Sequence, residues 1–153
     1  SFNLLRKKIK NRHTAPVIDD FVIKPEYIAE VMPQINHIIQ KHKNFMYTVA
    51  GHVGDGNFHI IPLVDITDPG VRRAIPHIAK EVYDLVLKYR GSISGEHNDG
   101  LVRTPYLEQM YGESIYALFK KTKEIFDPEG IFNPRKKIGG TLSYAMDHLR
   151  EHW

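Results

Sequence analysis

Two hydrophobic periodicities alternate along the chain and predict strands and helices in turn. β-branched and aromatic residues are concentrated in three stretches that predict strands, namely residues 16–23, 45–53 and 58–64. Apolar positions recur at three- and four-residue steps in residues 25–41 and 69–89, which predicts two helices that each bury one face. A short run at residues 92–94 predicts a fourth strand. The order strand, helix, strand, strand, helix, strand is typical of an α+β fold of the ferredoxin-like kind, an antiparallel sheet with two helices on one face.

A helical C-terminal tail is predicted after this region. Residues 114–126 have the spacing of another amphipathic helix, which the Asp-Pro-Glu-Gly sequence at residues 127–130 would end, and residues 142–149 predict a last helix. With 153 residues, the chain has the length of one domain, and it can bury a core without a disulfide or a structural metal.

The composition excludes several classes of protein. The absence of cysteine excludes disulfides, thiolate nucleophiles, iron–sulfur clusters and cysteine-based zinc modules, so any metal would need His, Asp or Glu ligands. The formal net charge is +3, and the basic cluster over residues 6–12 lacks interleaved aromatic residues, which favours a solvated face over a nucleic-acid partner.

The cellular location is inferred from segments that the sequence lacks. No apolar run approaches the ~20 residues that a bilayer requires, and the N-terminus lacks the order of a signal peptide. We therefore expect a cytoplasmic protein, whose parent enzyme could still associate peripherally with a membrane. The start at Ser1, without a Met, indicates a piece of something larger.

The motif GHVGDGNFH at residues 51–59 carries the first candidate chemistry. Asp-Gly is a strong hairpin signal, and a two-residue turn at this pair would place His52 directly opposite His59. The Cβ atoms of opposed residues on one face lie about 4.5–5.5 Å apart, so the two imidazoles could share one cation. An ordinary hairpin with two exposed polar histidines is the alternative.

The motif SGEHNDG, around Glu96, offers a third ligand. Glu and His are seldom buried without partners and Gly is uncommon within strands, which favours a site loop at the end of a strand. With His52 and His59, Glu96 would complete the nitrogen and oxygen ligand set of an open metal site, and His97 would be available for proton transfer. The alternative is that the Asp-Gly pair of this motif is simply another turn.

Three motifs together resemble the C-terminal domain of FAD-linked oxidases, the family of the vanillyl-alcohol-oxidase fold that includes D-lactate, D-2-hydroxyglutarate and glycolate dehydrogenases. They are GHVGDGNFH, SGEHNDG and FDPEGIFNP, and the sequence APVIDD precedes them. The resemblance covers nearly the whole chain, and it implies that residues 1–153 form a domain of this family. It implies a cap or substrate sandwich over about residues 1–95, and a site loop and tail over about residues 96–153 that returns to a flavin domain. That FAD-binding domain would lie N-terminal to Ser1, and the chain has no Gly-rich pyrophosphate loop of its own.

The resemblance also implies roles for single residues. His52, His59 and Glu96 match the metal ligands of the family, with Zn or Mn the foremost candidates. His97 matches the residue proposed as the base, and Arg6 resembles the arginine that binds the substrate carboxylate.

Asn133 resembles the tail asparagine that touches the isoalloxazine ring of FAD. The implied reaction is the oxidation of a small D-2-hydroxy acid such as D-lactate. Hydride passes from C2 to FAD, and the metal assists deprotonation of the hydroxyl group. A quinone, an electron-transfer flavoprotein or an iron–sulfur partner would accept the electrons. The isolated fragment is expected to be inactive.

Four positions depart from the family pattern. Asn98 stands where Gly commonly follows Glu-His, and Arg135 stands where Gly usually follows Asn-Pro. Ile18 and Ile61 stand where the hydroxyglutarate enzymes have polar substrate contacts, and Ile61 shares a strand face with His59 by the period-two rule. These two apolar residues favour a short or apolar D-2-hydroxy acid.

Two other classes of function remain open at this point. A metal-binding or interaction module could keep the same fold without redox activity. A nucleic-acid binder that uses the N-terminal basic cluster would show steeply salt-dependent affinity for any polyanion.

Overall fold

The computed structural model describes residues 12–15, 17–43 and 45–149 of the chain. They form two compact units, the first extending through Glu96 and the second comprising His97–Leu149. Within the described ranges, no helix is both long enough and apolar enough to cross a bilayer.

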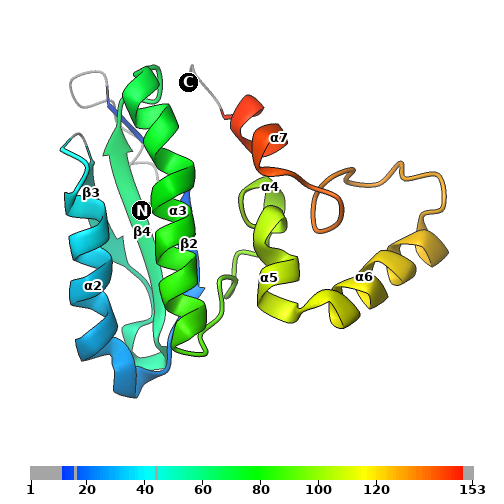
Figure 1. Ribbon diagram of the computed structural model, residues 1–153, viewed down its shortest axis with the longest axis horizontal. Helices are drawn as coiled ribbons and strands as arrows, with labels where there is room; N and C mark the ends of the chain where they lie inside the picture. Colours follow the sequence, from blue (N-terminus) through cyan, green and yellow to red (C-terminus); the bar gives the residue numbers. More distant parts are fainter. Residues whose placement is uncertain (1–11, 16, 44, 150–153) are drawn as a thin grey trace. The chain divides into compact units, whose positions relative to one another are not determined.

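The first unit contains a four-stranded antiparallel sheet with β4 at its centre (Figure 1). Its strands are β1 (His13–Thr14), β2 (Ile18–Val22), β3 (Met46–Ala50) and β4 (Asn57–Val64). β3 pairs with β4 along one edge, and β1 and β2 pair with successive parts of the other edge. The α+β class predicted from the sequence is therefore confirmed.

The strand expected at residues 92–94 is reduced to a single bridge between Ser92 and Val22. Their backbones exchange two hydrogen bonds of 2.7 and 2.8 Å. Ser94 instead donates its N–H to the Ser92 hydroxyl, which bends the chain away from the sheet. Because this element is not a full strand, the ferredoxin-like detail of the prediction is not confirmed.

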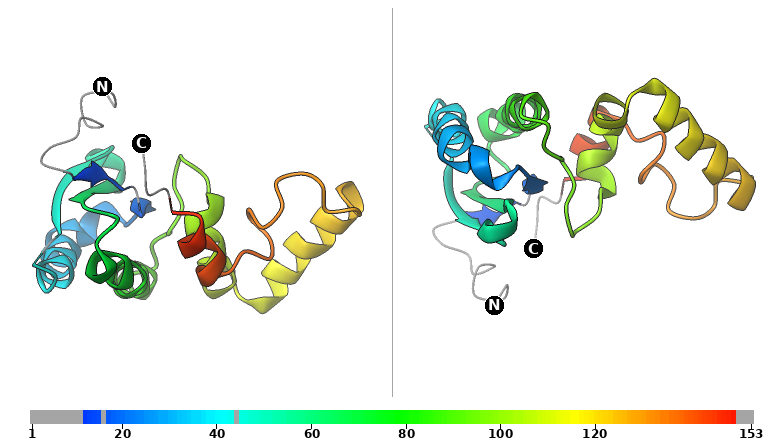
Figure 2. Two further views of the ribbon diagram at one scale, coloured as in Figure 1. Left: turned by 90° about the horizontal axis from the view of Figure 1, so that it is seen from above. Right: turned by 90° about the horizontal axis from the view of Figure 1, so that it is seen from below.

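Two long helices cover one face of the sheet, as Figures 1 and 2 show from three directions. They are α2 (Ile28–Gln40), which follows a 3₁₀ turn at Pro25–Tyr27, and α3 (Pro69–Lys88). Asp68 caps α3 by accepting hydrogen bonds from the N–H groups of Gly70 and Val71. Both predicted helices are confirmed, with ends within a few residues of those expected.

The core lies between these helices and the sheet. Its fully or almost fully buried members come from β2, β4 and both helices, and include Phe21, Ile60, Ile35, Ile39, Ile78 and Val82. The rings of Phe21 and Phe58 stack at 5.7 Å between centroids, which joins β2 to β4 within this core. Because side chains alternate along a strand, His59 lies on the face opposite Phe58 and Ile60. The helices therefore leave the His59 face of the sheet available for a site.

A β-bulge interrupts β2 where it passes His59. Ile18 pairs with Ile60 and Phe21 pairs with Phe58, so Asp19 and Asp20 together lie opposite the single residue His59. Asp20 adopts the left-handed conformation with φ of 65°, which is uncommon for a residue other than glycine. The extra residue keeps Ile18 and Phe21 in the core on both sides of the acidic pair.

The second unit is helical. It contains α4 (Gly100–Arg103), a 3₁₀ turn (Thr104–Tyr106), α5 (Leu107–Tyr111), α6 (Glu113–Phe126) and α7 (Leu142–Asp147). The expected helices at 114–126 and 142–149 are confirmed with small shifts of their ends, whereas α4 and α5 were not anticipated. The loop before α7 is held by hydrogen bonds from Lys137 N to Thr104 Oγ1 and from Gly139 N to the Tyr116 hydroxyl.

Candidate functional site

The loop between β3 and β4 differs from the turn expected from the sequence. β3 already ends at Ala50, which pairs with His59, and the six residues from Gly51 to Gly56 form the connection. The two-residue Asp-Gly turn is therefore wrong, and His52 does not lie directly opposite His59. The reason is that the carbonyl oxygen of His52 accepts the N–H groups of Asp55 and Asn57, so a 3₁₀ turn replaces the last expected strand pairs.

Two glycines allow this loop to lie against its neighbours. Gly56 has φ of 72°, and a Cβ atom there would lie 1.8 Å from the Ile23 carbonyl oxygen. Gly51 has φ of 131°, and a Cβ atom there would lie 2.4 Å from the Asn57 carbonyl oxygen. Side chains would be excluded at both positions by backbone atoms that have no room to move.

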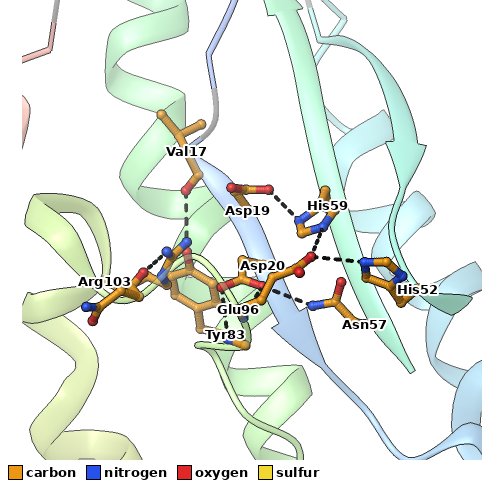
Figure 3. Close-up of polar contacts among 11 residues, drawn as sticks. Val17, Asp19, Asp20, His52, Asn57, His59, Tyr83, Glu96 and Arg103 are labelled. Carbon is orange, nitrogen blue, oxygen red and sulfur yellow. Dashed lines mark hydrogen bonds and ion pairs between the residues drawn. The ribbon is translucent and has the colours of Figure 1, made fainter. Parts of the chain in front are cut away.

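The three predicted metal ligands nevertheless meet at one atom (Figure 3). Oε1 of Glu96 lies 3.0 Å from Nε2 of His59 and 3.5 Å from Nε2 of His52. His59 comes from the central strand, His52 from the loop and Glu96 from the segment after the Ser92 bridge. The His59 side chain is 10% exposed, whereas that of Glu96 is 45% and that of His52 is 67% exposed, so the cluster opens to solvent on one side.

Asp20 fixes the backbone that carries Glu96. Its Oδ2 accepts the N–H of Gly95 at 2.9 Å, and its Oδ1 accepts the N–H of Glu96 at 2.9 Å and the side-chain amide of Asn57 at 3.0 Å. Asp20 is fully buried, so these bonds compensate for the loss of water around its carboxylate.

Asp19, the other acid of the bulge, contacts His59 from the opposite side. Its Oδ1 lies 2.9 Å from Nδ1 of His59 (Figure 3). Sequence reasoning missed both Asp19 and Asp20 as site residues. A signal was present, because two adjacent acids inside a predicted strand are unusual and a buried Asp needs partners.

The amide oxygen of Asn57 is a further polar group of this region. Asn57 lies two residues before His59 on the same face of β4, and its side-chain nitrogen donates a hydrogen bond to Asp20. Its Oδ1 is buried and has no hydrogen-bond partner among the residues that the structure describes. A buried acceptor without a partner is uncommon and is consistent with a ligand or water at the site.

The donor set fits a divalent cation. Ligand atoms of Asp20, His59 and Glu96 all lie within 4.8 Å of one another. The three N–H donors bound to Asp20 occupy most of the acceptor positions of its carboxylate, so His59, Glu96 and His52 are the better ligands. Two imidazoles and one carboxylate suit a divalent transition metal and leave positions open for a small molecule.

His97 and the residues after it belong to the second unit. His97 is exposed and directly follows Glu96 in the chain. Asn98 has φ of 65° and Arg135 has φ of 60°, so both departures from the family pattern fall on left-handed backbone. Glycine adopts this conformation without strain and Asn tolerates it better than most residues, which explains why glycine is usual at these positions. Arg6 lies outside the described residues.

Asn133 lies in the turn that follows α6. It is exposed and has φ of 46°. Asp127 holds the preceding turn, because its carboxylate accepts the N–H groups of Ile131 and Phe132, each at 2.9 Å, and pairs with the Lys123 ammonium. The hydrogen bond from Lys123, followed by those from the two backbone N–H groups, lowers the pKa of Asp127 below its usual value.

An apolar stripe lies on α6 and continues into this turn. Its members on the helix are spaced by three, four or seven residues, and all are solvent-exposed: Ile115, Leu118, Phe119, Ile125 and Phe126, followed by Ile131 and Phe132. Phe126 is 81% exposed and Leu118 is 61% exposed. Several large apolar side chains exposed along one helix are typical of an interaction site.

The chain is similar to several curated proteins that are much longer than it is. It is 32% identical over 121 residues to a D-2-hydroxyglutarate dehydrogenase of Escherichia coli K12, which covers 79% of the chain and 12% of that protein. It is 34% identical over 119 residues to a D-lactate dehydrogenase of Archaeoglobus fulgidus, which covers 78% of the chain and 26% of that protein. A glycolate oxidase subunit GlcD of Bacillus subtilis is 31% identical over 120 residues, 25% of its length.

The chain thus spans between about an eighth and a quarter of the length of these relatives. The family described as FAD linked oxidases, C-terminal domain, matches residues 1–137, which include all three motifs that carry the resemblance. On this match, and with the candidate ligands gathered at Glu96, the chain belongs to the C-terminal domain family of the FAD-linked oxidases.

Proposed function

We propose that this chain is the substrate-binding part of a flavin-dependent D-2-hydroxy-acid dehydrogenase. The observation that carries the proposal is the convergence of His52 and His59 on one oxygen of Glu96, at 3.5 and 3.0 Å. These are the residues that the family resemblance matches to metal ligands. The dehydrogenase and oxidase names of the relatives support the same class of reaction.

Each proposed residue has a separate task. His52, His59 and Glu96 bind a divalent cation, and the solvent-exposed side of the cluster admits the hydroxyl and carboxylate groups of the substrate. His97 removes the hydroxyl proton, and Arg6 binds the substrate carboxylate. When bound, the cation would supply Lewis acidity that makes the hydroxyl group more acidic, and FAD would supply the acceptor for the hydride of C2.

The substrate is a short or apolar D-2-hydroxy acid, of which D-lactate is the model. Ile61 supports this choice, because it lies two residues beyond His59 on the same face of β4 and offers no polar contact to a second carboxylate. Ile18 does not add support. It pairs with Ile60 and is fully buried on the helix side of the sheet, so it lies on the face away from the cluster.

The proposed partner is an FAD-binding domain of the same parent protein. The relatives are roughly four to eight times longer than the matched region, which leaves room for such a domain. The exposed stripe on α6 is suited to dock on it, and the exposed Asn133 then supplies one contact to the isoalloxazine ring. A quinone, an electron-transfer flavoprotein or an iron–sulfur protein would take the electrons onward.

Anaerobic flavin reduction in the full-length protein tests this function. The protein is mixed with D-lactate, glycolate or D-2-hydroxyglutarate, and bleaching of the flavin absorbance is followed before and after removal of metal by a chelator. We expect D-lactate to bleach the flavin fastest, and chelation to slow the reaction until Zn²⁺ or Mn²⁺ is returned. A flavin that stays oxidised with all three acids in the metal-loaded protein would refute the proposal and favour a metal-binding module without redox activity.

A further inference from the structure

His59 lies between two carboxylates that contact opposite sides of its ring. Nε2 lies 3.0 Å from Oε1 of Glu96, and Nδ1 lies 2.9 Å from Oδ1 of Asp19. The side chains of His59 and Asp19 are only 10% and 14% exposed. Hydrogen bonds shielded from water in this way hold a side chain in one orientation more firmly than exposed ones.

The β-bulge explains how Asp19 reaches this ring. Asp19 and Asp20 together occupy the position opposite His59, because Ile18 and Phe21 keep their pairing with β4 on both sides. The two acids bind different partners. Asp20 turns with φ of 65° to bind the backbone of Gly95 and Glu96, while Asp19 remains with the imidazole.

The contact with Asp19 affects which ring nitrogen of His59 carries the proton. A neutral imidazole carries one N–H and one nitrogen lone pair, and only the nitrogen with the lone pair can bind a cation. A carboxylate acceptor at Nδ1 favours the tautomer with the proton on that atom. Glu96 is a carboxylate acceptor at Nε2 as well, and a cation held between Nε2 and Glu96 would take the place of a proton there, which leaves the lone pair on Nε2 and the ring proton on Nδ1 facing Asp19.

We propose that Asp19 is a positioning residue that fixes the tautomer and orientation of His59 for cation binding. The inference rests on the proposed metal centre and adds a residue to it that does not itself touch the cation. Outer partners of metal-binding histidines contribute to affinity by holding the ring and raising its basicity, and their loss typically weakens binding by roughly 10–100-fold.

Metal titration of this chain tests the inference. Zn²⁺ and, separately, Mn²⁺ are titrated calorimetrically into the unmodified chain and into its Asp19→Asn and Asp19→Ala variants. We expect Kd to rise about 10-fold for Asp19→Asn, which retains a weaker oxygen acceptor, and up to about 100-fold for Asp19→Ala. Asp84→Asn, on α3, is the matched control and should leave Kd within about twofold, because Asp84 is half-exposed and pairs with solvent-exposed Lys80 on the same helix.

A second readout separates positioning from a general loss of structure. In the Zn²⁺-loaded chain, ¹⁵N NMR of His59 should show a protonated Nδ1 and a bound Nε2. In Asp19→Ala the signals should shift towards a mixture of ring states, while far-UV circular dichroism stays unchanged. Should Asp19→Ala unfold, the near-isosteric Asp19→Asn still gives the Kd comparison.

The outcomes distinguish this inference from the function on which it rests. Unmodified chain that binds neither Zn²⁺ nor Mn²⁺ would overturn the metal centre itself. Unmodified chain that binds metal, together with Asp19 variants of equal Kd and equal ¹⁵N signals, would overturn the positioning role and leave the metal centre standing.

Discussion

The backbone N–H of Gly95 donates to Oδ2 of Asp20 at 2.9 Å, and a Cβ atom on Gly95 would lie only 2.6 Å from Oδ1 of the same carboxylate. It would also lie 2.7 Å from the side-chain nitrogen of Asn57. Real Cβ atoms do not approach other atoms so closely. The segment that carries Glu96 can therefore reach the buried acid only because residue 95 has no side chain.

We expect Gly95→Ala to weaken both the fold and the metal centre. The added methyl group must displace Asp20 or Asn57, which breaks hydrogen bonds of a buried carboxylate and should cost about 1–3 kcal/mol of unfolding free energy. Glu96 shifts with its backbone, so Kd for Zn²⁺ should rise. Chemical denaturation and metal titration measure the two effects.

Gly54→Ala is the matched control for this change. Gly54 lies in the loop between β3 and β4, and a Cβ atom there would have no other atom within 4 Å. The same substitution should therefore change stability and Kd little. Equal effects of the two variants would contradict the argument from close approach.

His59→Ala should reduce metal uptake more than His52→Ala. His59 is buried on the central strand and is held from both sides of its ring, whereas His52 is exposed on the loop. Elemental analysis and titration with Zn²⁺ or Mn²⁺ measure the difference. His77→Ala, an exposed position on α3, is the control. Uptake by His59→Ala equal to that of the control would refute the assignment.

The purified 153-residue chain should be colourless. The proposed role of Asn133 supplies a single contact to the flavin ring, and the 153 residues hold no Gly-rich loop for the pyrophosphate. Absorbance spectra of the purified chain, with and without added FAD, measure this. Stoichiometric flavin copurifying with the chain would show that the cofactor site has been misplaced.

On the proposed roles, His97→Asn and Arg6→Ala in the full-length protein should have different kinetic signatures. Loss of a base should slow flavin reduction by ~10²–10⁴-fold at saturating D-lactate, whereas loss of the carboxylate contact should chiefly raise KM. Stopped-flow reduction of the flavin at several substrate concentrations separates the two. Unchanged single-turnover reduction in His97→Asn would mean that another group is the base.

Asp127→Asn should lower the free energy of unfolding at neutral pH, and this loss should be smaller in acid. The pKa of Asp127 is lowered in the fold, so its charged form stabilises the folded state above its unfolded pKa of about 3.9. This contribution is lost as the pH falls through the still lower folded pKa. The gap between the denaturation midpoints of the two proteins should therefore stay constant near neutral pH and narrow as the pH falls below about 4. A gap that widens in acid would contradict the sign of the shift.

The helices could be predicted because their apolar spacing is periodic over many residues. α2, α3 and α6 each bury or expose one face, and each was expected within a few residues of its ends. The short helices α4 and α5 were missed, since four or five residues are too few for a period to appear. Three residues are likewise too few to show a period, so the strand predicted at residues 92–94 proved to be only a bridge between Ser92 and Val22.

The ligands of the candidate site could be predicted, but the way the chain brings them together could not. His52 was expected to reach the site by cross-strand pairing, and it reaches it through a six-residue loop whose 3₁₀ turn depends on backbone hydrogen bonds. The roles of Asp19 and Asp20 depend on a bulge. Residue type alone gives no signal for which strand position takes up an extra residue.

The bulge in β2 limits how this site could be transferred to another scaffold. A designer who grafted the two histidines and Glu96 onto a regular antiparallel sheet would place a single residue opposite His59, where this chain has Asp19 and Asp20. A single acid at that position could bind either the His59 ring or the backbone N–H of Glu96. The ligand without this hydrogen bond would then not be held in place. A successful graft would therefore have to copy the irregular strand together with the ligands.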